Sequence, residues 1–335
     1  MRLENVLALT DGTVINEPFV KKFTNIVFDV QKVKRGDLFI AFDERVIEEA
    51  IINGAYGIVF DKPTQITDSE IAWIKVPQLQ DALKRLLRFR LIEKDIIAYE
   101  TNEIVLKLAL QMMTESNFVA VDGDIISIAK ELWDLEDASV VLFFANRHTE
   151  NLFTNIKPMP SSLSSSITIM EQTLFETSFI YKDIFYERQL ISPFFIPYLE
   201  ELLHLLTLLN INFRLKKFIP IEHFEAVFTN KKFEIKEFGT SDKVLIFEKN
   251  CSLVQEEILY LKKQATWAKT VFILPFTRSA EYDEGDNIFI YKNEKEILQV
   301  LKSNNFHFAL IVGVDKSILS KPLVNQSQMS LFDFN

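Results

Sequence analysis

The sequence is poor in glycine, with 8 glycines among 335 residues, well below the average usage of ~7%. Glycine lets the backbone approach a ligand closely and adopt positive φ angles. A shortage of glycine therefore leaves few places for a loop that wraps a phosphate with backbone N–H groups. A drift in composition toward Phe, Ile, Lys and Asn explains the shortage as well as a loss of glycine loops does, since phenylalanine is abundant at 30 residues.

Cysteine is rarer still, and Cys251 is the only one. With a single cysteine, the chain can form neither an internal disulfide nor a multi-cysteine metal site. A lone cysteine also fits a reducing compartment. No apolar run reaches membrane-spanning length, and the start, MRLENVLALTDGTVINEP, lacks the apolar run and cleavage site of a secretory signal. We therefore expect a cytoplasmic protein that does not insert into a membrane.

Positive charge is also scarce, because 37 Lys and Arg stand against 47 Asp and Glu for a net charge of −10. Sequence-independent binding to nucleic acid depends on neutralising many phosphates with Lys and Arg. The charge therefore disfavours direct nucleic-acid binding. The length fits two or three domains, and 48% hydrophobic residues suffice for several cores.

Strand-like and helix-like segments alternate along the chain, which predicts an α/β fold with parallel or mixed sheets. They form three parts, residues 1–94, 95–217 and 218–318, and an aperiodic tail at 319–335. The first part ends in a helix, LQDALKRLLRFRLIE, whose leucines give it an apolar side. Its Lys84, Arg85, Arg88 and Arg90 can be interpreted as an anion-binding face or as a solvated face, and we favour the solvated face.

Three stretches of the first part carry a resemblance to a known family. QKVKRGDLFIAF, followed by AIINGAYGIVFDK and IKVPQLQDALKRLL, resembles the N-terminal, UDP-binding domain of the Mur ligases, most like MurF and MurE. NFVAVDGDIISIAKELWDLEDASVVLFFANRHTENL is similar to part of the central ATPase domain, and FIPIEHFEAVFTNKKFEIKEF to the start of the C-terminal domain. The resemblance covers most of the chain. It implies a three-domain Mur-ligase-like architecture with a central domain shortened after residue 151.

The nucleotide sites of the family are largely missing from this sequence. The resemblance places the phosphate loop, Thr-Gly-Thr-Asn-Gly-Lys-Thr, on DIIAYETNEIVLKLALQ, where only Thr101 and Asn102 match it. The missing lysine removes a charge contact to the phosphates, and Glu100 and Glu103 add repulsion. Of the Asp-Ser-Arg that contacts the uridine nucleotide, only Asp29 remains. We interpret Thr101 and Asn102 as a remnant phosphate loop and Asp29 as a remnant uridine site.

Two further matches concern metal ions. Asp122 matches the acidic residue that ligates Mg²⁺, and His148 with Glu150 matches the histidine turn that holds a second metal. The residues themselves leave an alternative open, in which Asp122 caps the helix that begins GDIISIAK and His148 is an ordinary loop histidine. The other histidines, His204, His223 and His307, share no ligand spacing.

The last residues, LVNQSQMSLFDFN, have no periodicity and carry a different resemblance. A five-residue run is similar to the bacterial sliding-clamp-binding peptide, Gln-Leu-Ser/Asp-Leu-Phe, and comprises Gln328, Met329, Ser330, Leu331 and Phe332. Such a peptide inserts an apolar pair into a preformed pocket. In the alternative interpretation, the apolar residues of the tail pack on the C-terminal sheet.

The family reaction implied by the resemblance is ATP-driven amide formation on a UDP-muramoyl-peptide, with ATP and Mg²⁺ as cofactors. The missing loop residues instead favour a non-catalytic homologue without a cofactor, with a binding or regulatory role in peptidoglycan precursor synthesis and a UDP-muramoyl-peptide or a Mur ligase as partner. Two alternatives stay open. One is a divergent but active ATP-dependent ligase, and the other is a replication or repair factor that binds the sliding clamp from a Mur-ligase scaffold.

Overall fold

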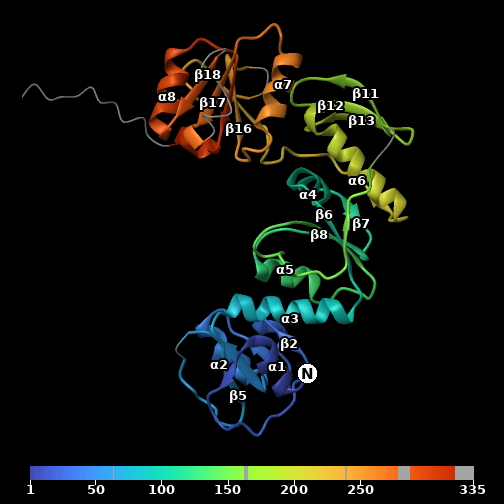
Figure 1. Cartoon of the computed structure of the whole chain (residues 1–335), viewed down its shortest axis with the longest axis vertical. Coiled ribbons are helices and arrows are strands. Elements are labelled where there is room, and N and C mark those ends of the chain that lie inside the picture. Colours follow the sequence, from blue (N-terminus) through green and yellow to red (C-terminus); the bar gives the residue numbers. More distant parts are fainter. Residues whose placement is uncertain (63, 162–164, 238–239, 278–286, 321–335) are drawn as a thin grey trace, which may run out of the picture. The chain divides into compact units, whose positions relative to one another are not determined.

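The computed structural model describes residues 1–62, 64–161, 165–237, 240–277 and 287–320 (Figure 1). The chain divides into two compact units. The first contains residues 1–161 and 204–214, and the second contains residues 162–203 and the chain from Leu215 onward. The predicted boundaries at residues 94, 217 and 318 stay a prediction, because compactness alone does not separate those parts.

The first sheet of unit 1 has the strand order β1-β5-β4-β3-β2. Strands β2 to β5 pair in parallel, and β1 is antiparallel to β5. The strands are β1 (Thr13–Val14), β2 (Ile26–Val27), β3 (Leu38–Ile40), β4 (Gly57–Phe60) and β5 (Ala72–Lys75). The helices are α1 (Leu3–Thr10), α2 (Ile47–Ile52) and α3 (Leu79–Glu93), with short 3-10 turns η1 (Val30–Lys32) and η2 (Glu44–Val46). Strands β3 and β4 are buried along their whole length, which explains their continuous apolar sequence.

The second sheet of unit 1 has the order β10-β6-β9-β8 and is parallel throughout. Its strands are β6 (Ile97–Thr101), β8 (Phe118–Val121), β9 (Val140–Phe144) and β10 (Ile156–Pro158), and its helices are α4 (Glu103–Ala109) and α5 (Ile125–Leu132). A small antiparallel pair joins β7 (Met113–Thr114) to β14 (Phe213–Arg214).

Helix α3 connects the two layers of unit 1, packing against both α1 and α5 (Figure 1). Its leucines at positions 83, 86, 87 and 91 are buried, as the sequence pattern predicted. They lie in one continuous core with Ile125, Ile128 and Leu132 of α5. This shared core joins the first sheet to the second.

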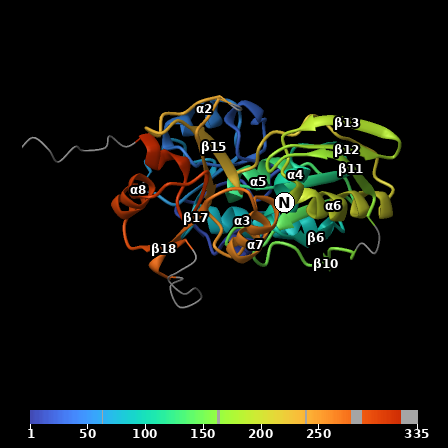
Figure 2. The same cartoon turned by 90° about the horizontal axis from the view of Figure 1, so that it is seen from above.

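Unit 2 begins with three antiparallel strands that lie side by side (Figure 2). They are β11 (Ile167–Gln172), β12 (Thr177–Tyr181) and β13 (Ile184–Gln189), followed by the 3-10 turn η3 (Pro193–Phe195) and α6 (Ile196–Leu208), of which residues 204–208 belong to unit 1. Strands β12 and β13 form a hairpin. The Glu200 carboxylate accepts hydrogen bonds from the backbone N–H groups of Ser166 and Ile167 at 2.8 and 2.9 Å, which ties the start of β11 to α6.

The large sheet of unit 2 has the order β15-β16-β19-β17-β18, in which only β15 is antiparallel. The strands are β15 (Glu225–Thr229), β16 (Lys243–Glu248), β17 (Thr270–Pro275), β18 (Ile288–Tyr291) and β19 (Phe308–Val312), with α7 (Val254–Gln264), α8 (Glu294–Ser303) and η5 (Lys316–Ser320). These parallel and mixed sheets confirm the predicted α/β class. Among the described residues, no helix combines the length and the apolar character needed to span a bilayer.

Candidate functional site

The turn between β6 and α4 is the position at which the resemblance places a phosphate loop. β6 ends at Thr101 and α4 begins at Glu103, so Asn102 alone connects them. The Asn102 side-chain oxygen accepts a hydrogen bond from the Val105 backbone N–H at 2.9 Å. This is helix N-capping, and it satisfies an N–H group that a bound phosphate would otherwise use.

The other residues of this turn do not face a ligand favourably. The Thr101 side chain is buried, and its hydroxyl has no hydrogen-bond partner among the described residues. Glu100 is exposed beside it, and Glu103 occupies the first turn of α4. Two carboxylates next to a one-residue connection repel a phosphate. Thr101 and Asn102 are therefore placed where the sequence predicted, in a turn too short to cradle an anion.

Asp122 follows β8 and lies beside a lysine of α4. The Lys107 ammonium nitrogen is 2.7 Å from Asp122 Oδ2, and Asp122 Oδ1 accepts a hydrogen bond from the Gly123 N–H at 2.7 Å. Burial opposes ionisation of this carboxyl, but the hydrogen bonds from Lys107 and Gly123 and the lysine charge outweigh burial and lower the pKa of Asp122. Lys107 thus supplies the positive charge that a divalent cation would bring to this carboxylate.

The alternative role of Asp122 as a helix cap is wrong. Helix α5 is capped by Asp124, whose carboxylate accepts a hydrogen bond from the Ser127 N–H at 2.8 Å. The two aspartates differ because Asp124 immediately precedes the helix, whereas Asp122 ends the strand. The residue that caps α5 therefore lies two positions later in the sequence than the alternative placed it.

His148 and Glu150 lie in the loop after β9. The His148 ring nitrogen Nε2 is 3.0 Å from Arg147 Nε, and its backbone N–H donates to the Asn146 side chain at 2.8 Å. Glu150 is exposed. Within the part of the chain that the structure describes, no three His, Cys, Asp or Glu side chains gather in a group that could hold a metal ion. The structure does not bring Asp122, His148 and Glu150 together in such a group.

These residues do not fit a magnesium nucleotide. Asn102 occupies an N–H group of the helix terminus, Glu100 and Glu103 oppose a polyphosphate, and Lys107 is paired with Asp122. An N–H group of the α4 terminus and the Asp122 carboxylate are thus already engaged by side chains of the chain itself. No chemical step through ATP can be derived from this arrangement.

A second candidate site lies in unit 1 beside Asp29. A cavity of about 450 Å³ opens there, and aromatic, cationic and acidic side chains line it. Its aromatic and cationic lining residues are Phe28, Trp133, Lys32, Lys34, Arg90 and Lys130. The Asp29 carboxylate also lines the cavity and accepts a hydrogen bond from the Gln31 N–H at 3.1 Å, which fixes the turn η1.

The walls of this cavity are held by contacts on both sides. The Phe28 and Trp133 rings meet edge to face with centroids 5.5 Å apart, and the Arg90 guanidinium lies 5.2 Å from the Trp133 ring. The buried Asp37 carboxylate accepts hydrogen bonds from the Asn25 side chain at 3.2 Å and the Lys34 N–H at 3.0 Å. Cations beside aromatic rings suit an anionic ligand that carries a planar ring.

The predicted uridine site included Asp29 but not Lys32, Lys34 or Lys130, which line the same cavity. The sequence pattern of α3 offered an anion-binding face as the less favoured alternative for Arg90. The favoured interpretation placed Arg90 on the solvated face of α3, whereas Arg90 packs on Trp133, a residue of the second layer. Lys32 and Lys34 belong to the QKVKRGDLFIAF stretch that carried the family resemblance. Their spacing of two within that stretch was a signal for a cationic wall.

A buried ionisable cluster in unit 2 also escaped the sequence analysis. His223 Nδ1 lies 2.9 Å from Glu248 Oε1, and both side chains are buried. Glu248 also accepts hydrogen bonds from the N–H groups of Phe224 and Asn250 at 3.0 and 2.6 Å. Burial, with the neighbouring charge of Glu248, raises the pKa of the fully buried Glu257 well above its usual range. Glu257 follows Val254 by three residues and precedes Leu261 by four, which is helical spacing. This spacing predicts that Glu257 lies on the apolar face of α7.

Comparison with known proteins supports the fold and goes no further. No family model matches the sequence, and no curated protein matches it. Crystal structure I of MurF from Acinetobacter baumannii aligns with a TM-score of 0.50 at 10% identity, covering 95% of this chain and 98% of that chain. The MurF ligase from Thermotoga maritima in complex with ADP aligns with a TM-score of 0.46 at 12% identity, covering 88% and 94%. The alignment with the Acinetobacter baumannii structure confirms the predicted Mur-ligase-like fold.

Proposed function

We propose that this Mur-ligase-like protein is a non-catalytic member of peptidoglycan precursor metabolism that binds a UDP-muramoyl-peptide in the cavity beside Asp29. The observation that carries the non-catalytic half is the Lys107–Asp122 ion pair, in which a lysine ammonium group contacts the carboxylate that the resemblance assigns to Mg²⁺. The capping of α4 by Asn102 supports it. A protein with this ion pair and this cap would bind the precursor without activating it through ATP. Such a protein acts as a sensor or a carrier of the precursor.

The binding half rests on the chemistry of the cavity. A uridine nucleotide has a planar ring and a diphosphate, and the cavity offers Phe28 and Trp133 for contact and four cationic side chains for charge. Three aspartates, Asp29, Asp37 and Asp134, also line it, so the cations exceed the carboxylates by one. Its volume of about 450 Å³ falls within the ~300–1,000 Å³ of ordinary ligand pockets. The proposed ligand therefore matches the site in size, in its aromatic contacts and in the excess of positive charge.

Thermal unfolding with added UDP and with a UDP-muramoyl-peptide tests this proposal. A ligand that binds only the folded state raises the Tm. We expect both compounds to raise it, and the double variant Lys32→Ala/Lys34→Ala to lose the shift. Lys75→Ala is a matched control, because Lys75 is an exposed lysine of β5 outside the cavity lining. Equal shifts in all three proteins, or none in the wild type, would refute the binding role.

A second candidate function rests on the QMSLF run at residues 328–332, which lies outside the described residues. We propose the sliding clamp as the partner of this segment. The net charge of −10 favours an indirect over a direct link to DNA. The two candidates are compatible, because one uses a cavity of unit 1 and the other a terminal peptide.

A further inference from the structure

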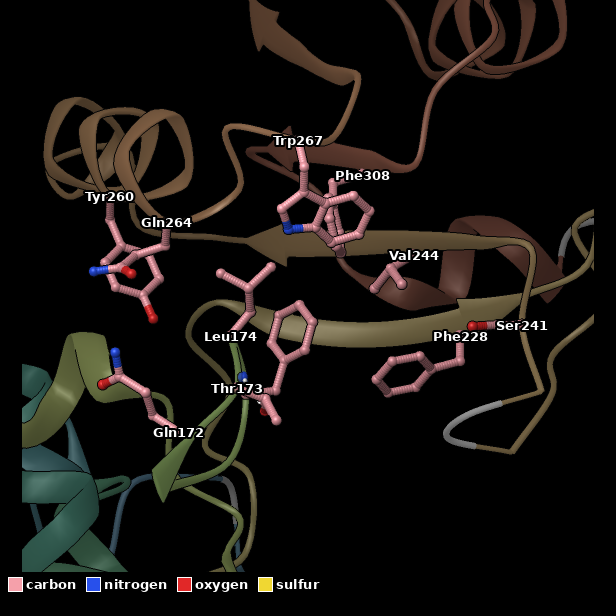
Figure 3. Close-up of a pocket in the computed structure, with 11 residues that line it drawn as sticks. Gln172, Thr173, Leu174, Phe228, Ser241, Val244, Tyr260, Gln264, Trp267 and Phe308 are labelled. Carbon is pink, nitrogen blue, oxygen red and sulfur yellow. Dashed lines mark hydrogen bonds between the residues drawn. The ribbon is translucent and has the colours of Figure 1, made fainter. Parts of the chain in front are cut away.

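Unit 2 contains a cavity that has no part in the function proposed above. It has a volume of about 420 Å³ and lies between the β11–β12 turn, α7 and the amino ends of β16 and β19 (Figure 3). In Figure 3, Leu174 on the β11–β12 turn points toward Trp267 and Phe308, while Tyr260 and Gln264 extend from α7. Every residue that lines this cavity has an uncharged side chain.

Five of the eleven residues that line this cavity are aromatic. The Phe175 ring contacts Phe228 edge to face with centroids 5.8 Å apart, and it lies 6.4 Å from Phe308. The Trp267 ring meets Phe308 edge to face at 5.8 Å. Aromatic rings prefer such offset and edge-on contacts with further rings. The cavity therefore presents an apolar surface of aromatic side chains to which a further aromatic ring can pack.

Trp267 is the exceptional member of this wall. It is 72% exposed, whereas the other two tryptophans of the protein, Trp73 and Trp133, are 0% and 7% exposed. A tryptophan this exposed at the edge of an apolar cavity is a surface that a ligand would cover. One side of the ring contacts Phe308 and His307, and the exposed side is open to a ligand.

The polar side chains of the lining define the rest of the ligand. Gln172 lies at the end of β11 and Gln264 at the end of α7, and each carboxamide has both donors and an acceptor. Burial raises the pKa of Tyr260, so its phenol stays neutral at physiological pH. A charged ligand would lose hydration here without gaining an opposite charge.

We propose that this cavity binds a small neutral aromatic compound that carries a hydrogen-bonding group such as a carboxamide. The rings of Phe175, Phe308 and Trp267 contact the aromatic ring, and the glutamine side chains contact its polar substituent. This site is independent of the cavity beside Asp29 and would exist whether or not that cavity binds a nucleotide.

The indole N–H resonances of the ¹⁵N-labelled full-length protein test the proposal directly, because three tryptophans give three signals. Trp267→Phe assigns the signal of Trp267. Benzamide is the probe. We expect it to shift the Trp267 signal saturably at millimolar concentrations, with no shift of the buried Trp73 and Trp133. Cyclohexanecarboxamide, which lacks the aromatic ring, and benzoate, which is charged, should bind at least tenfold more weakly.

Two variants separate this site from nonspecific contact. Gln264→Ala should weaken benzamide binding several-fold, because it removes the carboxamide that meets the probe. Leu259→Ala is the matched control, because Leu259 is on the same helix, is 60% exposed and does not line the cavity. Absence of a saturable shift at Trp267 would overturn the proposal. Equal affinity for benzamide and cyclohexanecarboxamide, or equal weakening by both variants, would overturn it as well.

Discussion

The ammonium nitrogen of Lys107 lies 2.7 Å from the carboxylate of Asp122. Lys107 belongs to α4, which follows β6, and Asp122 comes directly after β8; in the sheet, β9 lies between β6 and β8. Their pairing neutralises the acidic residue that the resemblance assigns to Mg²⁺.

Replacing Lys107 with methionine should destabilise unit 1. Asp122 is partly buried and would lose its charged partner, so we expect the free energy of unfolding to fall by about 1 kcal/mol after allowing for solvent screening. The pKa of Asp122 is lowered in the folded state, so this contribution is present at neutral pH and is lost as the pH falls below 3.8. Urea denaturation at pH 7 and pH 3 measures both effects.

Arg45→Met is the control for that experiment. Arg45 pairs with Asp43 at 2.7 Å, but the arginine side chain is 88% exposed. Exposed ion pairs contribute little to stability, so we expect no measurable change. A loss of stability equal to that of Lys107→Met would mean that charge balance, rather than the specific contact with Asp122, determines the effect.

Asn102→Ala should remove the cap of α4. Loss of an N-cap side chain costs about 1 kcal/mol of unfolding free energy, because an N–H group of the first turn loses its partner. Asn102→Ser keeps a capping oxygen and should retain most of the stability. Urea denaturation of both variants gives the comparison, and an alanine variant as stable as the wild type would show that the hydrogen bond to Val105 is unimportant.

Glu257→Gln should change how stability depends on pH. Burial raises the pKa of Glu257 in the folded state, so its contribution is full below the unfolded value of 4.5 and is lost as the pH rises through the folded value. While the folded state holds a proton that the unfolded state releases, stability falls by about 1.4 kcal/mol per pH unit. Chemical denaturation at pH 6 and pH 8 should therefore show a steeper fall for the wild type than for the glutamine variant. An equal change in unfolding free energy between the two pH values in both proteins would contradict a raised pKa of Glu257.

A labelled synthetic peptide of residues 323–335 should bind a bacterial sliding clamp in fluorescence anisotropy. Buried apolar anchors dominate such contacts at ~2 kcal/mol or more each, so changing Leu331 and Phe332 to alanine should abolish most of the affinity. Asp333→Ala should have little effect. If the wild-type peptide fails to bind at micromolar concentrations while the double alanine change lowers the Tm of the whole protein, the segment packs on its own chain instead.

Much of the fold was predictable from periodicity. The helix LQDALKRLLRFRLIE has the predicted limits, because its leucines recur at helical spacing and its polar side is continuous. The antiparallel strand β11 was not predicted, because five of its six residues are exposed and give no apolar alternation. The short helix α1 was also missed, since its N-cap residue, Arg2, makes no capping hydrogen bond.

The candidate sites were less predictable, because they depend on contacts between distant elements. The sequence identified Asp122 and Asn102 by their positions in a motif, but the pairing of Asp122 with Lys107 requires the order of β6, β9 and β8 in the sheet. His223 and Glu248 are 25 residues apart and meet only through the antiparallel pairing of β15 with β16. Spacing in the sequence carries no information on such contacts.

Phosphate release from MgATP, measured with a UDP-muramoyl-peptide and D-alanyl-D-alanine, tests most directly whether the ligase chemistry is absent. With Asn102 capping α4 and Lys107 paired with Asp122, we predict no release above that of a protein-free control. A turnover that depends on the protein and is lost in Asp122→Asn would contradict this prediction and identify the chain as an active ligase.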